Sequence, residues 1–503
     1  MFKNHFNITR RNVIIVFFVF LLPGLSPAQT IPVDDRLKGL EVYVDSALKE
    51  FRVAGCAVAI IEKNKIVFAK GFGYRDYENK LPVTANTVFP IASCTKAFTA
   101  TLCGILANEG KLDLDKPVHD YYPLLKFYNE YTTAHATPRD LMSHRTGLPR
   151  HDNLVNFFDT SLPKDSLIYR FRYLEPSAEL RQKAQYTNIM YIALGGLAEK
   201  ITGLSWEQNT KQKILDPIGM TNTSFTVADL NANADHSFGY YRKNNAIVKG
   251  EHKNAEITAP AGGINSSVND MAKWLITWMQ GGSYNGKQVI PKNYLRQAVS
   301  LQMVNGNANY GLGWLITTYR GGHFKIEHGG DLPLFSSNIC FYPGDSIGIV
   351  ILTNQFGGYV TNLLRDYISD RMLNSKRPDL PGGDWTSWFK GYKDYYASNN
   401  QPAGVQEAKS SKQIAPLSHP KEDYAGTYMH PGYGIIKILV EQDSLSAMFN
   451  KVPLHLKHIS YDIFEAKPGG RLRFSMDNNG KIISISMPLE ESVADIVFKK
   501  EEG

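Results

Sequence analysis

The sequence predicts an α/β (α+β) domain followed by a small all-β domain. Strand-like patterns occur close to residue 60 and again over 323–353, and mainly helical patterns lie between them. The composition changes over 376–418, and short strand patterns then recur to the end of the chain. We therefore expect one antiparallel sheet, built from both ends of a first domain that covers about 30–375, with a helical region between its two halves.

Composition agrees with a globular enzyme of more than one domain. The chain has 503 residues, 43% hydrophobic and 20% charged, which excludes a disordered or fibrous protein. The formal net charge is +7, and no block of Lys and Arg stands out, so nucleic-acid binding is not indicated. Four cysteines form no C-x-x-C pair, which disfavours a disulfide framework or a zinc module.

Residues 1–28 have the pattern of a secretory signal peptide. They carry three basic residues and no acid, followed by the ten apolar residues Val13–Leu22 and a small-residue cleavage site ending at Ala28. Ten apolar residues are too few to span a bilayer, so we expect no stable membrane anchor after cleavage. The sequence thus predicts an exported protein, with the periplasm as first choice and secretion as the alternative.

The elements of the first domain follow from apolar periodicity and from Gly and Pro punctuation. Apolar residues at helical spacing predict a helix over 35–52. Further helices are expected over 94–108, before Gly110, and over 188–202, 205–215 and 268–280. Strands are expected over 56–61 and 66–73, joined by a turn at Lys63-Asn64, and over 323–328, 335–342 and 346–353.

The C-terminal part reads as a helix, a linker and a separate barrel-like domain. Four aromatic residues at helical spacing, Trp385, Trp388, Phe389 and Tyr392, favour a packed helix, and 400–418 read as a polar linker. Seven strands are expected within 419–503, with a hairpin turn at Asp477–Gly480. We expect this domain to be dispensable for the chemistry but not for full function: it either covers the mouth of the site and restricts substrate size, or it promotes assembly.

One Ser-x-x-Lys motif has the setting that catalysis needs. The motif occurs at Ser46, Ser93, Ser161, Ser387 and Ser418, and only Ser93 opens an apolar helix. There Lys96 lies one turn from the serine on the same helix face, so its amine can reach the hydroxyl. The apolar residues before Ser93 should bury the pair and lower the pKa of Lys96, which would let it act as a base.

Two other short motifs are weak alone. Tyr-x-Asn occurs at Tyr77–Asn79 in a polar turn and at Tyr186–Asn188 before an apolar helix, where Asn188 is the expected N-cap. His328-Gly329-Gly330 ends a strand, which on its own indicates no more than a turn. G-x-S-x-G, H-E-x-x-H, P-loop and G-x-G-x-x-G motifs are absent from the sequence.

In their order along the chain, these motifs resemble those of the serine β-lactamase and penicillin-binding protein superfamily. The order is Ser93-Cys94-Thr95-Lys96, then Tyr186-Thr187-Asn188, then His328-Gly329-Gly330. The resemblance covers about 35–372 and is closest to the class C branch, with its esterase and D-aminopeptidase relatives. Flanking segments match as well: 141–149, 216–220 and 260–264. The last domain is similar to the lipocalin-like domain often appended to such hydrolases.

The resemblance implies a role for each motif residue. Ser93 would be the nucleophile that forms an acyl-enzyme, and Lys96 would take its proton directly or through Tyr186, whose phenol pKa the nearby cation would lower. Asn188, Gly329 and Gly330 would bind substrate, and His328 would orient Tyr186 or meet a substrate carboxylate. The backbone N–H groups of Ser93 and Asp331 would form the oxyanion hole. Neither a metal nor an organic cofactor is implied.

One departure from the pattern bears on the substrate. Relatives that act on β-lactams usually have Lys where this chain has His328, and a His is only partly charged near neutral pH. The sequence therefore favours a serine hydrolase of peptide, amide or ester bonds, acting on a peptide or another small molecule. The alternatives are a β-lactamase or D,D-peptidase, and a non-catalytic binding protein that keeps the fold. Oligomeric state is left open.

Overall fold

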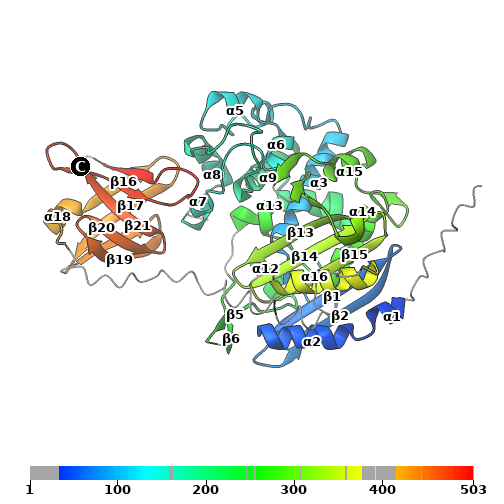
Figure 1. Cartoon of the computed structure of the whole chain (residues 1–503). Coiled ribbons are helices and arrows are strands. Elements are labelled where there is room, and N and C mark those ends of the chain that lie inside the picture. The colour runs from blue at the N-terminus through cyan, green and yellow to red at the C-terminus, as the bar shows by residue number, and fades with distance from the viewer. Residues whose placement is uncertain are drawn as a thin grey trace, which may run out of the picture.

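The structure is a computed structural model that describes residues 33–157, 163–244, 246–252, 256–305, 308–356, 359–375, 391, 415–442 and 444–501. Figure 1 shows a sheet flanked by helices and, beside α7 (Asp152–Asn156) and α8 (Lys164–Arg170), a separate barrel. The expected signal segment, the aromatic stripe and most of the expected linker lie outside the described residues.

A nine-stranded antiparallel sheet unites the two ends of the first domain, as the sequence predicts. Its order is β10-β11-β12-β13-β14-β15-β1-β2-β3. β1 (Gly55–Glu62) pairs with β2 (Lys65–Asp76) on one side and with β15 (Ile347–Thr353) on the other. The remaining strands are β3 (Leu81–Pro82), β10 (Met303–Asn305), β11 (Ala308–Tyr310), β12 (Leu315–Thr318), β13 (Phe324–Leu332) and β14 (Phe335–Tyr342).

Helices bury both faces of the sheet. Along β1, Val58 and Ile60 point into one apolar cluster, while Ala59 and Ile61 point into the other, because successive side chains of a strand face opposite ways. The first cluster is closed by α2 (Leu40–Phe51) and α16 (Tyr359–Met372). The second is closed by the helical region, which Figure 1 shows on the other side of the sheet.

The main helices agree with the sequence, with two local differences. α3 (Thr95–Asn108), α9 (Asn188–Thr202) and α14 (Val268–Met279) form as expected. The single helix expected over 35–52 is instead α1 (Val33–Leu37) and α2, since Gly39 between them adopts φ +81°. The helix expected over 205–215 begins as α10 (Trp206–Thr210) and widens to a π-turn over Lys211–Leu215.

Shorter elements complete the helical region. The helices are α4 (Val118–Tyr121), α5 (Glu130–His135), α6 (Pro138–Met142), α11 (Asp216–Ile218), α12 (Val227–Ala232), α13 (Ala259–Gly262) and α15 (Lys292–Ala298). The paired short strands are β4 (Phe89–Pro90) with β7 (Asn265–Ser266), β5 (Tyr240–Lys243) with β6 (Ala246–Lys249), and β8 (Ser283–Tyr284) with β9 (Lys287–Gln288). Among the described residues, no helix has both the length and the apolar character needed to cross a membrane.

The C-terminal domain is a closed antiparallel barrel of eight strands. Seven strands are expected from the sequence, because 455–465 read as one strand. The structure divides this stretch at Tyr461, whose φ of +49° turns the chain, while the predicted Asp477–Gly480 turn does join two strands. The helix α18 (Lys421–Tyr424) precedes β16 (Gly426–His430), β17 (Gly434–Glu441), β18 (Ser444–Phe449), β19 (Val452–Ser460), β20 (Ile463–Lys467), β21 (Gly470–Met476), β22 (Ile482–Met487) and β23 (Ile496–Lys500).

Candidate active site

Ser93 lies at the start of the buried helix α3, on the wall of a cavity of about 700 Å³. It belongs to a single 3₁₀ turn, Ala92–Cys94, that joins β4 to α3. Ala92 adopts φ +49°, a left-handed conformation that costs a non-glycine residue of the order of 1 kcal/mol. The surrounding structure therefore holds the backbone before Ser93 in a conformation that the chain would otherwise avoid.

Lys96 is fully buried and directly contacts Ser93. Its Nζ donates to Ser93 Oγ at 3.0 Å, to Asn188 Oδ1 at 2.8 Å and to the Ala261 carbonyl at 2.8 Å. Burial disfavours the charged ammonium and lowers the pKa of Lys96 to about 7, which confirms the direction expected from the sequence. Close to neutral pH, a substantial fraction of the Lys96 amine is therefore uncharged.

The partners of Lys96 orient its lone pair when the amine is neutral. Asn188 Oδ1 and the Ala261 carbonyl can only accept hydrogen bonds, so each fixes one N–H of the amine. Ser93 is the one partner whose hydroxyl can also donate. The neutral amine can therefore keep both N–H bonds and turn its lone pair to the Ser93 hydroxyl, which is the arrangement that a general base requires.

Asn188 links Lys96 to a pair of opposite charges on the cavity wall. Its Nδ2 donates to Asp152 Oδ1 at 3.1 Å, and Asp152 forms a salt bridge of 2.6 Å with Arg150. The Asp152 carboxylate raises the pKa of Lys96, and the Arg150 guanidinium lowers it, both against the larger effect of burial. The prediction that Asn188 caps its helix is wrong: Thr187 is the N-cap, and the Asn188 amide is used by Lys96 and Asp152.

Tyr186 packs over the same lysine, but its pKa moves opposite to the expectation. The ring centroid is 4.9 Å from Lys96 Nζ and 4.4 Å from the centroid of the His144 ring. Burial raises the pKa of Tyr186 far above its usual value, and a hydrogen bond with Ser93 offsets only part of this effect. The expected lowering by a cation is therefore wrong, because desolvation of the phenolate outweighs the neighbouring charges. Tyr186 is a neutral phenol beside Ser93.

His328 is a neutral buried residue and not a cation at the cavity. It is 2% exposed, and burial, followed by the charge of Lys96, lowers its pKa to about 4. Nδ1 lies 2.6 Å from the Gly329 carbonyl, which must accept, so Nε2 accepts from the Tyr310 hydroxyl at 2.9 Å. The expectation of a partly charged His328 is thus wrong, while the expected role of His328, to orient Tyr186 or to meet a substrate carboxylate, stays a prediction. Its ring lies 6.3 Å from that of Tyr186, centroid to centroid.

Strand β13 brings the two glycines and Asp331 beside Ser93. A Cβ on Gly330 would lie 2.5 Å from the Ile91 carbonyl oxygen and 2.8 Å from the Ser93 backbone nitrogen, so only glycine allows this close approach. Asp331 lines the cavity together with Ser93, and its Oδ1 accepts from Ser336 at 2.5 Å. Gly329 precedes them in β13 and accepts from His328, as described above.

The structure separates the site from the competing motifs. The Ser46 hydroxyl donates to Val42 within α2, and Ser418 donates to Asp462 in the barrel. In the other Tyr-x-Asn motif, the backbone N–H and the side-chain amide of Asn79 both donate to the Asp76 carboxylate and not to the Ser93 site. Ser161 and Ser387 lie outside the described residues. Among the described parts of the chain, no group of three or more His, Cys, Asp or Glu residues could hold a metal ion, and all four cysteines are buried free thiols.

Sequence reasoning missed the residues that surround Lys96. Ala261 and His144 lie within the flanking segments 260–264 and 141–149, which were noted only as a resemblance. Arg150 and Asp152 follow the second of these flanks, and Tyr310 lies in the short strand β11. The sequence carried no local signal for any of these contacts, since each joins segments that are far apart along the chain.

The fold and the Ser93–Lys96 pair together place the chain in the serine β-lactamase and penicillin-binding protein superfamily. The family model described as Beta-lactamase matches residues 40–373, and the chain belongs to this family. A second model, described as Domain of unknown function (DUF3471), matches residues 410–500, which include the barrel.

The curated relatives have low sequence identity to this chain, but the matches cover most of its length. Unguisins hydrolase ungD of Aspergillus violaceofuscus (strain CBS 115571) is 27% identical over 488 residues, 85% of this chain and 82% of the relative. Protein flp of Staphylococcus aureus (strain NCTC 8325 / PS 47) is 26% identical over 367 residues, 72% of this chain and 71% of the relative. The solved octameric penicillin-binding protein homologue from Pyrococcus abyssi shares the fold, with a TM-score of 0.61 and 22% identity, over 92% of this chain and 100% of that one.

Proposed function

We propose that this member of the family is a serine hydrolase that cleaves an amide, peptide or ester bond through an acyl-enzyme on Ser93. The observation that carries the proposal is the 3.0 Å contact between Ser93 Oγ and the buried Lys96 amine, whose pKa is lowered to about 7. Because this pair lies at a cavity of about 700 Å³, a peptide or another small molecule can reach the hydroxyl.

The proposed reaction needs only groups of this chain and water. Ser93 Oγ attacks the substrate carbonyl carbon while the neutral Lys96 amine takes the hydroxyl proton. The tetrahedral intermediate collapses to the acyl-serine ester, and the leaving amine or alcohol receives a proton from Lys96, directly or through the neutral Tyr186 phenol. A water molecule, deprotonated by the same amine, then attacks the ester carbonyl and releases the acid and free Ser93.

The oxyanion is proposed to form against backbone N–H groups of Ser93 and Asp331. Gly330 brings β13 close to the Ser93 nitrogen, and Ser93 and Asp331 both line the cavity. Such donors stabilise the developing negative charge by roughly 3–4 kcal/mol when they are already in position. The N-terminus of the α3 segment adds a favourable field at the same point.

Peptides, amides and esters fit the site better than β-lactams. An antibiotic-directed site needs a permanent cation for the substrate carboxylate, whereas His328 is buried and uncharged at neutral pH. Arg150 is the cation among the described residues that line the cavity, and Asp152 pairs with it. The relative Unguisins hydrolase ungD is named as a hydrolase, which supports hydrolase chemistry at Ser93.

Export belongs to the same proposal. The basic start, the apolar run Val13–Leu22 and the small residues up to Ala28 have the order of a signal peptide, which places the mature protein in the periplasm or, alternatively, outside the cell. Mass spectrometry of the N-terminal peptide, from protein recovered after expression with its full N-terminus, should show a chain that begins at Gln29. An uncleaved N-terminus would contradict export by this route.

The function is tested on a mixed substrate panel. Wild-type protein and Ser93→Ala are compared on p-nitrophenyl esters, D- and L-aminoacyl amides and cephalosporins. We expect turnover of at least one ester or amide by the wild type and none by Ser93→Ala. Turnover confined to cephalosporins would support the β-lactamase alternative, and a fluorophosphonate that labels neither protein would support a non-catalytic binding protein.

A further inference from the structure

The C-terminal barrel is attached to the wall of the catalytic cavity. One attachment point is the segment 150–157, which contains α7; another is α8, where Arg170 donates to the Gly432 carbonyl. Arg150, Asp152, Val155 and Asn156 of this segment line the cavity that holds Ser93. His151, Asn153 and Phe157 of the same segment contact the barrel, so one short segment has a cavity side and a barrel side. In Figure 1, α7 lies in the part of the helical region next to the barrel.

Four hydrogen bonds join the segment to the barrel. The His151 backbone N–H donates to Glu490 Oε2 at 2.7 Å, and His151 Nδ1 lies 2.8 Å from the Tyr433 hydroxyl. Asn153 Nδ2 donates to the Leu489 carbonyl at 2.8 Å. Asn450 Nδ2 donates to the Phe157 carbonyl at 2.6 Å, and the Phe157 ring stacks on Phe449 with centroids 4.4 Å apart. The barrel therefore contacts nearly the whole length of the segment.

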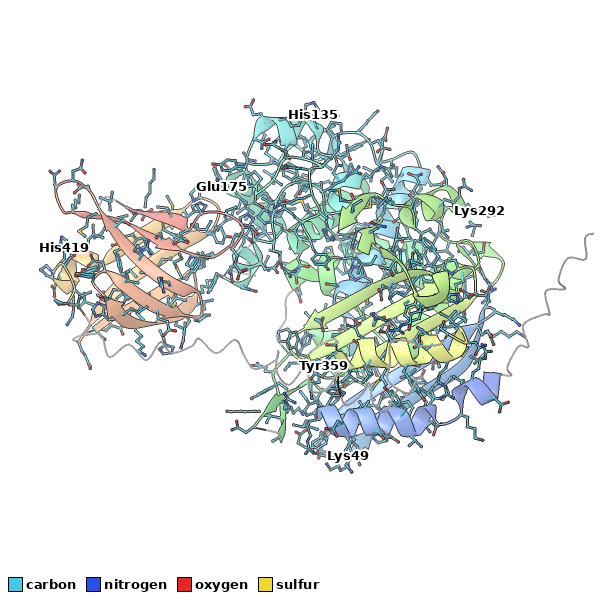
Figure 2. The ribbon with its side chains drawn as sticks, in the orientation of Figure 1. Lys49, His135, Glu175, Lys292, Tyr359 and His419 are labelled. Carbon is cyan, nitrogen blue, oxygen red and sulfur yellow. The ribbon has the colours of Figure 1, made fainter. Side chains whose placement is uncertain are left out.

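The barrel supplies half of the polar partners of the His151 ring. His151 is completely buried, and burial lowers its pKa, so the ring is neutral at pH 7. Nε2 faces the Glu175 carbonyl at 3.0 Å and must donate to it, so Nδ1 accepts from the Tyr433 hydroxyl. Figure 2 shows Glu175 on the side of the helical region that faces the barrel. Loss of the Tyr433 hydroxyl would leave a buried nitrogen without its partner.

The segment cannot be expected to keep this conformation unaided. α7 has five residues, far below the length of about 12 at which isolated helices become marginally stable. His151 adopts φ +45°, which costs a non-glycine residue free energy and persists only where surrounding contacts determine it. Of the three hydrogen bonds made by the His151 backbone N–H and ring, two are to the barrel. The next residue, Asp152, receives the hydrogen bond from Asn188, and Asn188 receives that of Lys96.

We propose that Tyr433 and Glu490 of the barrel are positioning residues of the active site. They hold the segment 150–157, and thereby keep Asp152 and its partner Arg150 in position. Asp152 can then accept the hydrogen bond of Asn188, which in turn accepts that of Lys96. This inference rests on the proposed function of Ser93 and Lys96. It departs from the expectation that the barrel is dispensable for the chemistry. Neither barrel residue touches substrate, and both act through the wall that they hold.

The proposal is tested in the full-length protein by the rate of Ser93 labelling with a fluorophosphonate. We expect Tyr433→Phe to slow labelling about tenfold, the equivalent of one buried hydrogen bond. The matched control is Tyr428→Phe, which also removes a buried barrel hydroxyl, but one that donates to Tyr424 within the barrel. This control should label at the wild-type rate. Equal rates for Tyr433→Phe and the wild type would overturn the proposal.

A second comparison separates positioning from general loss of stability. Glu490→Gln keeps an oxygen that can accept from the His151 N–H, so it should label close to the wild-type rate, whereas Glu490→Ala should be slowed. In an Asp152→Ala background, which removes the acceptor of the Asn188 amide, Tyr433→Phe should cost little more, because the contact that Tyr433 positions is already gone. If Tyr433→Phe reduces the labelling rate by the same factor in both backgrounds, Tyr433 acts only on stability and the proposal is refuted. Absence of labelling in the wild type would instead refute the role of Ser93.

Discussion

The opposed charges of Asp152 and Arg150 should set the pH at which the enzyme becomes active. In the proposed mechanism Lys96 must be neutral to accept the Ser93 proton, so kcat/KM should rise with pH through the Lys96 pKa, about 7. Asp152→Asn removes a charge that raises this pKa, so the rise should move to lower pH. Arg150→Gln removes a charge that lowers it, so the rise should move to higher pH.

The size of the Asp152 effect follows from two hydrogen bonds. Lys96 Nζ and Asp152 are bridged by the Asn188 amide, with contacts of 2.8 Å and 3.1 Å, so the two charges lie roughly 6–8 Å apart. At an effective dielectric constant of ~20, their attraction is about 2–3 kcal/mol, equivalent to a change of roughly 1.5–2 in pKa. Partial exposure of Asp152 and its pairing with Arg150 reduce this, so we expect a displacement of about one pH unit.

The assay is the pH dependence of kcat/KM for an ester substrate, measured at two salt concentrations. Asp152→Asn keeps an oxygen that can accept from Asn188, so the change removes charge and little else. Its maximal rate should also fall, since a less basic Lys96 is a weaker proton acceptor. Displacement of both variants in the same direction, or of neither, would refute Lys96 as the titrating base.

Three further predictions follow from contacts of the same site. Gly330→Ala should lower kcat/KM by at least about tenfold while circular dichroism shows an intact fold, because its Cβ would press on the Ile91 carbonyl and the Ser93 nitrogen; a wild-type rate would show that β13 does not need this close approach. Lys96→Ala and Tyr186→Phe should each be severe in kcat, with the double variant little worse than the poorer single one, since residues acting as a unit are non-additive; fully additive losses would separate their roles. Nitrocefin turnover should be weak or absent in the wild type. His328→Lys should lower the melting temperature and should not confer nitrocefin turnover, because the new cation would be buried beside Lys96. Efficient nitrocefin hydrolysis by either protein would contradict the conclusion that the buried, neutral His328 disfavours β-lactams.

The sequence was sufficient for the elements whose signals are local. The strand pair at β1 and β2, the helices α3 and α9 and the barrel hairpin at Asp477–Gly480 each follow from a short pattern, because one periodicity and one turn decide them. The formation of one sheet from both ends of the first domain was also predictable, since apolar strands at either end leave edges that must pair. The break at Gly39 was missed because helical spacing continues through it.

The electrostatics of the site could not be predicted in the same way. The lowered pKa of Lys96 was anticipated from the apolar residues before Ser93, since burial has one sign for an amine. For Tyr186 the same burial opposes the nearby cation, and only the structure shows which effect is larger. His328 was expected to be partly charged because the sequence does not reveal its burial. Nor does it reveal the hydrogen bond of His328 with Tyr310, eighteen residues earlier in the chain.

Side-chain contacts between the barrel and the first domain were beyond sequence reasoning altogether. The barrel carries none of the three motifs, so it was expected to stand apart from the chemistry. In the structure, Tyr433 and Glu490 reach His151, whose neighbour Asp152 meets Asn188. No spacing or composition signal links residues that are about 280 and 340 positions apart. What the sequence offered was only the family-like flank that ends at Pro149, just before this segment.

The most direct test of the proposed mechanism is the site of covalent labelling. Full-length protein is treated with a fluorophosphonate, digested and analysed by tandem mass spectrometry, with Ser93→Ala as the control. The mechanism predicts one adduct, on Ser93, which disappears in Ser93→Ala while the variant keeps its melting profile. An adduct on Ser46, Ser161, Ser387 or Ser418, or labelling that persists in Ser93→Ala, would contradict it.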